Sequence, residues 1–415
     1  MRRSVLAAVV AATALSACAI ERGKQWGPPV VPAVPAVPEV SLVLLGDVGA
    51  KGRAGQATAV ELERVLAEHK RRGRPAVVLW LGDNIGPVGP GDLGRCTAPA
   101  AAWRAKGPAA LARVVRAHAA AGGAALAALG EQDWRCGQPE LELQPEPGKG
   151  PHPWAMPGHN YAVAVYPDGH VLVTMSCATG LCAPGPKDMS PETAPLVELV
   201  VVDSAAWLVP PRVNTPAAAR ADQSVAEQEA LLKALTAAPA PWPRLLVSHH
   251  PLESAGPHGV GGMYSDSGYY LHAAPVRRAV DAGLFAGALS AHDRMLLATG
   301  DIGPATKRSS RYWLEHPVFQ VISGSASAPD SRGGARGLWY FQGTALKAEL
   351  QTNRAGFAEL YVREDSVSAV LRRRRAGRWG AGTVTIPLGR PPHPAETPSP
   401  VMDPCLYCDP VPPRQ

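Results

Sequence analysis

The stretch Ser41-Leu42-Val43-Leu44-Leu45-Gly46-Asp47 decides the fold class of this chain. A nearly continuous apolar run that ends in Gly-Asp is typical of a strand that is buried on both faces and carries a carboxylate at its carboxyl end. Residues 76–81 form a second run of this kind, which ends in Gly82-Asp83-Asn84. The sequence therefore predicts two buried strands, each followed directly by an aspartate.

Helical segments are expected around the second strand. Over 57–71 the apolar side chains recur at helical spacing, and Gly73 follows as a stop signal. An alanine-rich segment over 103–121 predicts another helix, and the weaker run 124–129 predicts a third strand, which ends in Gly130-Glu131. Strands that alternate with helices in this way predict an α/β domain with a parallel sheet.

The second half of the chain predicts mixed strand pairing. Between residues 161 and 204 three short β-like runs follow one another without a helical segment, which favours antiparallel strands within the same domain. The strand–helix pattern then returns, with helices expected over 224–237 and 273–282 and strands over 244–248, 284–289, 318–322, 357–362 and 366–371. We therefore expect an α/β architecture that contains parallel and antiparallel strands.

Composition limits the class of protein. The chain has 415 residues, of which 46% are hydrophobic, so a sizeable core is expected and wholesale disorder is excluded. Its 42 glycines and 43 prolines predict long loops, without a collagen-like period. The formal charge of +6 comes from 41 basic and 35 acidic residues, a mild excess that gives no reason to expect nucleic-acid binding.

The N-terminus has the pattern of an export signal. Met1-Arg2-Arg3 is followed by an apolar run over 5–15, which is too short to span a bilayer core of about 30 Å. Leu15-Ser16-Ala17-Cys18 resembles the bacterial lipobox, in which the cysteine is lipidated and becomes the new N-terminus. Ala19 after this cysteine implies sorting to the outer membrane of the bacterial cell envelope, on its periplasmic or surface side. An ordinary signal peptide whose small residues precede a cysteine is the alternative.

These patterns divide the chain into four segments. Residues 1–17 are the expected lipoprotein signal peptide, and 18–40 are a tether, since prolines at this density favour a semi-rigid extended chain. The folded domain is expected over 41–390, and a proline-rich tail with a Cys-x-x-Cys pair over 391–415. Membrane contact is expected through the lipid anchor alone.

Five ionisable side chains each stand just past a strand-like run: Asp47, Asp83, Glu131, His249 and His292. In open α/β sheets, sites form outside the carboxyl ends of the strands, so these side chains are expected to converge. Carboxylates and imidazoles together suit Zn, Fe or Mn. A Gly-Asp after one strand is commonly a turn and a single histidine is commonly structural, but the same arrangement at five strand ends predicts a metal site.

The order of these elements resembles that of the calcineurin-like metallophosphoesterases and, within them, the tartrate-resistant branch of the purple acid phosphatases. The family motifs Gly-Asp-x-Gly, Gly-Asp-Asn, Gly-Asn-His-Asp, His-x-Pro and Gly-His-x-His correspond to five segments of this chain: 46–49, 82–84, 130–133, 249–251 and 291–294. The resemblance covers roughly residues 41–371. It implies a four-layer metallophosphoesterase sandwich, in which two packed β-sheets are flanked by helices.

The resemblance also implies roles for particular residues. Family members bind two metal ions, which clamp a phosphoester and activate a hydroxide for in-line attack on phosphorus. By position, Asp47 matches a carboxylate of the first metal, Asp83 the carboxylate that bridges both metals, and His249 and His292 imidazoles of the second. His258 matches a histidine that faces substrate and can protonate the leaving group. The implied activity is a metal-dependent phosphoesterase that acts on a phosphoester small molecule or a phosphoprotein.

The chain departs from the family pattern at four positions. Gly86 stands where the purple enzymes have the tyrosine that colours the iron site, so a purple Fe–Tyr centre is not expected. Glu131 and Gln132 replace an Asn ligand of the second metal and a His that contacts substrate. Arg294 replaces the last His of Gly-His-x-His, which is a ligand of the first metal. The residues expected nearest to the substrate are therefore Gln132, His258 and Arg294.

These departures leave the number of metal ions and the activity open. Because a guanidinium is always charged and pairs with carboxylates, we hypothesise that Arg294 occupies the place of the first metal beside Asp47, which leaves one ion. The ligands of that ion would be Asp83, Glu131, His249 and His292. The alternative is that the site has decayed by neutral drift, and the chain is then a catalytically impaired lipoprotein that acts as a surface binding module.

Seven cysteines fit an oxidising compartment once Cys18 is assigned to the lipid, because six remain. Cys177 and Cys182 flank a short glycine-containing loop and are a natural local pair. Cys96 and Cys136 are expected to form a bridge that braces two loops after site-bearing strands. For Cys405 and Cys408 a short structural disulfide is favoured over a redox or zinc motif, because no second Cys-x-x-Cys lies nearby.

One dense basic run, Arg372-Arg373-Arg374-Arg375, closes a strand-like segment. A solvated edge strand whose charges block further pairing is favoured here over a binding site for a polyanion.

Overall fold

The computed structural model describes residues 26–28, 37–48, 54–84, 106–135, 143, 152–178, 181–185, 194–208, 216–238, 240–252, 274–291, 295–299, 319–324, 326, 347–352 and 354–388.

The first of two sheets has six strands in the order β15-β14-β13-β1-β2-β3 within the described residues. Its strands are β1 (Val40–Leu45), β2 (Ala76–Leu81), β3 (Ala124–Ala128), β13 (Gly356–Val362), β14 (Ser366–Arg375) and β15 (Arg378–Pro387). β1, β2 and β3 are parallel, as the sequence predicts, whereas β13, β14 and β15 are antiparallel. The carboxyl ends of β1, β2 and β3 therefore lie along the same edge of this sheet.

The second sheet has nine strands in the order β12-β10-β11-β9-β8-β7-β4-β5-β6 over the same described part of the chain. They are β4 (Asn160–Val165), β5 (Val171–Ala178), β6 (Leu181–Pro184), β7 (Val197–Val201), β8 (Arg244–Val247), β9 (Gly287–Ser290), β10 (Met295–Thr299), β11 (Phe319–Ile322) and β12 (Lys347–Thr352). β7, β8, β9 and β11 are parallel, and β4, β5 and β6 are antiparallel. The expected antiparallel pairing between residues 161 and 204 is thus confirmed.

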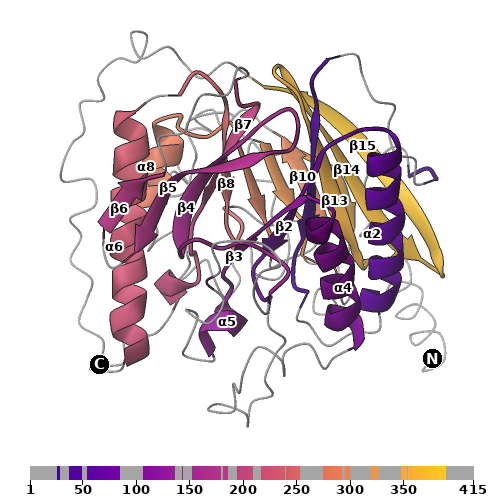
Figure 1. The fold of residues 1–415 in the computed structure, drawn as a ribbon, viewed down its shortest axis with the longest axis horizontal. Coiled ribbons are helices and arrows are strands. Elements are labelled where there is room, and N and C mark those ends of the chain that lie inside the picture. The colour runs from indigo at the N-terminus through magenta and orange to yellow at the C-terminus, as the bar shows by residue number, and fades with distance from the viewer. Residues whose placement is uncertain are drawn as a thin grey trace, which may run out of the picture.

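Helices cover the outer faces of the two sheets (Figure 1). On one side lie α2 (Ala54–Arg71) and α4 (Lys106–Ala120), which pack on each other. On the other side lie α6 (Pro216–Ala237) and α8 (Ala274–Asp281), with α6 against β4, β5 and β6. Two short helices, α5 (Glu131–Arg135) and η2 (Ala206–Leu208), follow β3 and β7. The expected fold class, two packed sheets flanked by helices, is confirmed.

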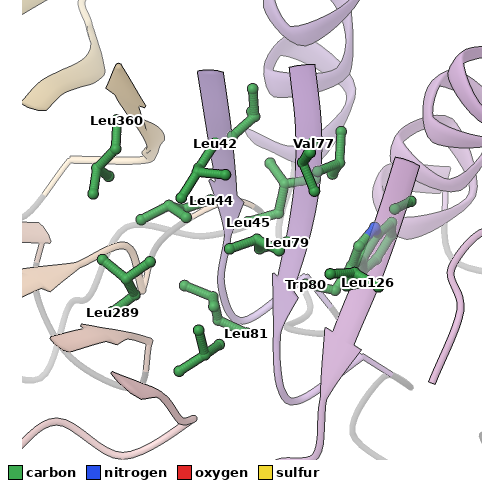
Figure 2. Close-up of a cluster of buried hydrophobic side chains, with 14 of the residues drawn as sticks. Leu42, Leu44, Leu45, Val77, Leu79, Trp80, Leu81, Leu126, Leu289 and Leu360 are labelled. Carbon is green, nitrogen blue, oxygen red and sulfur yellow. The ribbon is translucent and has the colours of Figure 1, made fainter. Parts of the chain in front are cut away.

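The apolar runs of β1 and β2 are continuous because both faces of these strands are buried. Figure 2 shows Leu44 of β1 and Leu81 of β2 on the side of Leu289, which comes from β9 of the second sheet. All three side chains are fully buried, and burial of one leucine contributes about 1.5–3 kcal/mol. This contact between the sheets brings the carboxyl ends of β1 and β2 next to those of β8 and β9.

Several elements were not expected from the sequence. β6, β10, β12 and β15 are additional strands, and α6 begins at Pro216 rather than at residue 224. Pro216 stands at the first helical position, where its fixed φ suits a helix and its missing N–H costs no hydrogen bond. Among the described residues, no helix is both long and apolar enough to cross a lipid bilayer.

The expected pair Cys177–Cys182 forms a disulfide between β5 and β6. The two residues lie directly opposite each other in the antiparallel pair, which places their Cα atoms 4.0 Å apart. The other cysteines assigned above, Cys18, Cys96, Cys136, Cys405 and Cys408, lie outside the described residues.

The interpretation of the basic run 372–375 as a solvated edge is wrong. β14 pairs with β13 on one side and with β15 on the other, so it is an interior strand. Arg372 is fully buried and pairs with Glu359 of β13 and, at 3.3 Å, with Glu61 of α2. Arg373 is turned the other way, and its guanidinium lies 3.9 Å from the ring centre of Trp26. The consecutive residues Arg372 and Arg373 thus make contacts on opposite faces of one interior strand.

Replacement of Arg372 by alanine is predicted to destabilise the fold by about 3–5 kcal/mol, because Glu359 would lose its buried cation. A shift of the urea unfolding midpoint measures this loss. Arg378→Ala is the matched control, since Arg378 is exposed on β15 and should leave the midpoint nearly unchanged. Equal midpoints for both variants would contradict a stabilising role for this buried pair.

Candidate metal centre

The carboxyl ends of β1, β2 and β8 meet at one place, and each carries an ionisable side chain there. Asp47 follows β1, Asp83 follows β2 and His249 follows β8, and one ligand atom from each of the three lies within 4.8 Å of the others. Glu131, the first residue of α5 after β3, forms a second such group with His249 and His250. The structure therefore brings together four of the five side chains that the sequence predicts at this site.

Glycines allow this convergence because a side chain at their positions would collide with the site. A Cβ on Gly82 would lie 2.5 Å from Nδ1 of His249, and a Cβ on Gly130 would lie 2.5 Å from Oδ1 of Asp83. A Cβ on Gly46 would meet the backbone oxygen of Ser323. The glycine that precedes each carboxylate in the sequence is therefore required by the close approach of the strands.

Asp47 and Asp83 both have a left-handed backbone, with φ of 50° and 52°. Residues other than glycine rarely adopt this conformation, and it costs about 1–3 kcal/mol where the surroundings impose it. Aspartate is among the residues that tolerate it best. The same strained conformation occurs at two neighbouring strand ends, and one carboxylate oxygen of each aspartate lies within 4.8 Å of a ring nitrogen of His249.

His249 is fixed in the orientation that a metal ligand needs. Its side chain is fully buried, and Nδ1 lies 2.7 Å from the carbonyl oxygen of Leu81, to which an Nδ1–H donates. Nε2 then faces the carboxylates, 2.8 Å from Oε2 of Glu131 and 3.6 Å from Oδ1 of Asp83. Such a bond on the second ring nitrogen is the usual companion of a coordinating histidine.

Backbone and side-chain hydrogen bonds hold the carboxylates in place. The backbone N–H of Gln132 donates to Oδ1 of Asp83 at 2.9 Å. Oδ2 of Asp133 accepts from the backbone of Gly130 at 2.8 Å, which fixes the start of α5. The Nδ2 group of Asn84 donates to the carbonyl of Ala128 at 2.7 Å and so ties the ends of β2 and β3 together. Gln132 therefore contacts the site through its backbone.

A buried aspartate anchors the far end of α5. Nε1 of Trp134 donates to both carboxylate oxygens of Asp203 at 3.1 Å, and Oγ of Ser224 on α6 donates to Oδ2 at 2.8 Å. A helix of five residues is too short to be stable alone, so these contacts are needed to place Glu131. Burial raises the pKa of Asp203, while the hydrogen bonds from Ser224 and Trp134 favour its charged form.

His250 is a site residue that sequence reasoning missed. Its Nε2 lies 3.4 Å from Oε2 of Glu131, and its ring stands nearly perpendicular to that of His249 at 4.8 Å between centres. The signal in the sequence is the doublet His249-His250 at the end of a strand. It was missed because adjacent residues of an extended strand point to opposite faces, whereas the strand has already ended at Val247.

The electrostatics of the site favour a cation. Burial raises the pKa of Asp83 well above its usual range, and the carboxylates of Glu131 and Asp47 raise it further. Burial lowers the pKa of His249, but the charges of Asp83 and Glu131 outweigh it, so this pKa lies well above 6.5. Oxygen and imidazole donors in this arrangement fit Zn, Fe or Mn.

The two candidate ligand groups share one atom. Asp47, Asp83 and His249 form one group, and Glu131, His249 and His250 form the other. Because Nδ1 of His249 is committed to Leu81, only Nε2 can coordinate, and one lone pair serves one ion. The described residues therefore support one well-ligated ion at a time.

The remaining predicted site residues lie outside the described part of the chain. These are His258, His292 and Arg294, so the pairing of Arg294 with Asp47 stays a prediction.

The close approach at Gly82 leads to a test with a matched control. Gly82 and Gly122 have φ of 85° and 87°, but a Cβ on Gly122 would meet nothing within 4 Å. Both alanine variants should lose about 1–2 kcal/mol from the left-handed backbone. Only Gly82→Ala should also weaken Zn²⁺ binding, by at least about tenfold, because it displaces the ring of His249. Equal Zn²⁺ affinity of the two variants, measured by calorimetry, would refute this.

Metal binding is also predicted to strengthen as pH rises. The pKa of His249 is raised in the metal-free protein, so below that pKa Nε2 carries a proton that an ion must displace. The pKa of Asp83 is raised as well. Affinity for Zn²⁺ or Mn²⁺ should therefore increase by about tenfold per pH unit for each displaced proton and level off above these pKa values. Calorimetric titrations from about pH 5 to about pH 8 measure the slope, and a flat affinity would contradict the expectation.

Comparison with known proteins identifies relatives by fold. No family model matches the chain, and no curated protein matches it. Among solved structures, GAP50, "the anchor in the inner membrane complex of Plasmodium", matches with a TM-score of 0.51 and 14% identity over 85% of this chain and 89% of that chain. The purple acid phosphatase PPD1 from seeds of yellow lupin (Lupinus luteus) has a TM-score of 0.46 and 13% identity, over 86% of this chain and 55% of that chain. PhoD has a TM-score of 0.48 and 11% identity, over 86% and 72%. At these identities, the likeness to GAP50 shows that the two chains share a fold.

Proposed function

We propose that the chain is a metal-dependent phosphoesterase anchored at the cell envelope. The observation that carries this proposal is the convergence of Asp47, Asp83 and His249 at three strand ends, with ligand atoms within 4.8 Å of one another. These residues stand in the motif order of the metallophosphoesterases that the sequence resembles. The substrate class is a phosphoester, either of a small molecule or on a phosphoprotein.

In such a reaction, different residues of this chain would bind the metal ion and donate the proton. A bound metal ion would supply a Lewis acid and lower the pKa of a water molecule. Asp83 and His249 would hold the ion, and both are fixed by hydrogen bonds from or to the backbone. His258 would donate a proton to the leaving group, as its place in the resemblance implies. The left-handed backbone of Asp47 aims its carboxylate at the same point.

A second candidate function is a binding module built on the same fold. Gly86, Gln132 and Arg294 stand where the resembled enzymes have residues that perform chemistry. Glu131 adds a negative charge beside the place where a phosphate would bind, and this charge repels phosphate unless a metal ion offsets it. GAP50, which shares the fold, is described as an anchor in the inner membrane complex of Plasmodium.

Anchoring rests on the lipobox-like sequence that ends at Cys18. On this proposal, the mature chain starts at Cys18 and is held at the bacterial outer membrane by its lipid. Residues 26–28 lie beside β15, where the backbone groups of Gly27 and Ala381 exchange hydrogen bonds of 2.9 Å. Seven residues, 19–25, would then separate the lipidated Cys18 from Trp26.

Hydrolysis of p-nitrophenyl phosphate and of its bis-ester, with added Mn²⁺, Zn²⁺ or Fe²⁺, tests the enzyme. Asp83→Asn is the variant of choice, because asparagine keeps the size of the side chain and tolerates the left-handed backbone. It should lower the rate at least about 100-fold, since it removes a charged ligand.

The outcomes of this assay separate the two candidates. Activity that survives in Asp83→Asn would come from a contaminant. A wild-type protein that binds metal and hydrolyses neither ester with any of the ions would favour the binding module.

A further inference from the structure

We propose that His250 is a direct ligand of the metal ion, in a set with Glu131 and His249, whose ligand atoms lie within 4.8 Å of one another and of that of His250. This inference rests on the proposed metal centre and assigns a role to the middle residue of the His-x-Pro element, which the resemblance leaves without one. Its consequence is that the ion sits on the side of Glu131 and His250 rather than on the side of Asp47.

The separations from Glu131 to His249 and His250 suit a tetrahedral ion. For metal–ligand distances of about 2.0–2.1 Å, tetrahedral ligands lie about 3.3 Å apart. Oε2 of Glu131 lies 2.8 Å from Nε2 of His249 and 3.4 Å from Nε2 of His250. Both separations lie within about 0.5 Å of the tetrahedral value. Oδ1 of Asp83, 3.6 Å from Nε2 of His249, borders this set without belonging to it.

The orientation of the His250 ring is built into the fold. Oγ of Ser204 lies 2.9 Å from Nδ1 of His250 and accepts from the backbone N–H of the same residue at 3.0 Å. A hydroxyl oxygen has two lone pairs and can accept both bonds, which leaves Nε2 of His250 to coordinate. Ser204 follows Asp203, the residue that anchors α5 through Trp134. The adjacent residues Asp203 and Ser204 thus hold both α5, which carries Glu131, and the ring of His250.

The imidazoles of His249 and His250 both direct Nε2 toward Oε2 of Glu131. His249 uses Leu81 to hold its Nδ1, and His250 uses Ser204. Both side chains are almost completely buried, with 0% and 1% exposure, and they come from a chain segment in which the strand has already ended.

The alternative tautomer gives His250 a different role. If the Ser204 hydroxyl donates to Nδ1, then Nε2 carries the proton and donates to Glu131. His250 would then be a positioning residue that orients Glu131, and it would make no bond to the ion. An experiment must therefore count coordinating histidines as well as measure affinity.

The affinity arm uses the full chain, with Zn²⁺ titrated against a chromophoric chelator. His250→Gln should bind Zn²⁺ at least about 10- to 100-fold more weakly than the wild type, and Ser204→Ala should show a smaller loss in the same direction. Asp47→Asn should weaken binding less than His250→Gln, because Asp47 is outside the proposed set. His118→Gln is the matched control, since His118 lies on α4 and bonds to the backbone oxygen of Ala76 at the start of β2, at the opposite end of this strand from Asp83, and should not alter affinity.

The spectroscopic arm uses Co²⁺ in place of Zn²⁺. Each coordinating imidazole gives one strongly shifted proton NMR signal from its other ring N–H, which exchanges with water. His250→Gln should show one such signal fewer than the wild type, and Ser204→Ala should shift one signal without removing it. An unchanged number of signals in His250→Gln would overturn the proposal, and with a weakened affinity it would establish the positioning role instead.

The outcomes also separate this inference from the proposed function. If the wild type binds neither Zn²⁺ nor Co²⁺, the metal centre itself fails. If the wild type binds metal and His250→Gln keeps both affinity and signal count, this inference alone fails. Urea unfolding checks that His250→Gln is folded. If it is not folded, Ser204→Ala replaces it as the test: a shift of one imidazole N–H signal of the Co²⁺ protein supports coordination by His250, and unchanged signals overturn it.

Discussion

The whole site depends on one hydrogen bond, from Nδ1 of His249 to the carbonyl oxygen of Leu81 at 2.7 Å. The donor follows β8 in the nine-stranded sheet, and the acceptor ends β2 in the six-stranded sheet. The bond therefore joins the two sheets at the edge where their strands end. It also leaves no room for a Cβ on Gly82, which is why a glycine in a left-handed conformation stands between Leu81 and Asp83. This hydrogen bond thus accounts for the Gly82-Asp83 motif, for the left-handed backbone of Gly82 and for the orientation of the His249 ring.

Buried charge is handled in two different ways in this protein. Between α2 and the six-stranded sheet, Glu359 is fully buried but is neutralised by Arg372. Its pKa is lowered to about 2, because the charges of Arg372 and His69 outweigh the effect of burial. At the metal centre, Asp83 is likewise buried, but its nearest charges include Glu131 and Asp47, and its pKa is raised. The first arrangement stabilises the fold without any ligand, whereas the second becomes favourable when a cation binds.

The sequence allowed the positions of the site-bearing strands to be predicted because these strands are buried on both faces. β1 and β2 appear as uninterrupted apolar runs, and the residue after each run is necessarily at the sheet edge. The same reasoning failed at Arg372, because a buried arginine looks like an exposed one until its partner Glu359 is known, and that partner is on another strand. β15 was missed because its polar residues alternate on a half-exposed strand. His250 was missed because its direction depends on where β8 ends, which the sequence does not mark.

Glu131, which stands where the resembled family has an amide ligand, has a physical counterpart elsewhere in the chain. A second carboxylate beside Asp83 increases repulsion within the site, and an unfavourable pair of this kind persists only if an added positive charge offsets it. Nε2 of His250 lies 3.4 Å from Oε2 of Glu131, where it can provide an additional nitrogen donor. Nε2 of His249 can serve one ion only, so on the proposed function Glu131 and His250 would add donors to a single ion. The departure at Glu131 would then change the metal site rather than abolish it.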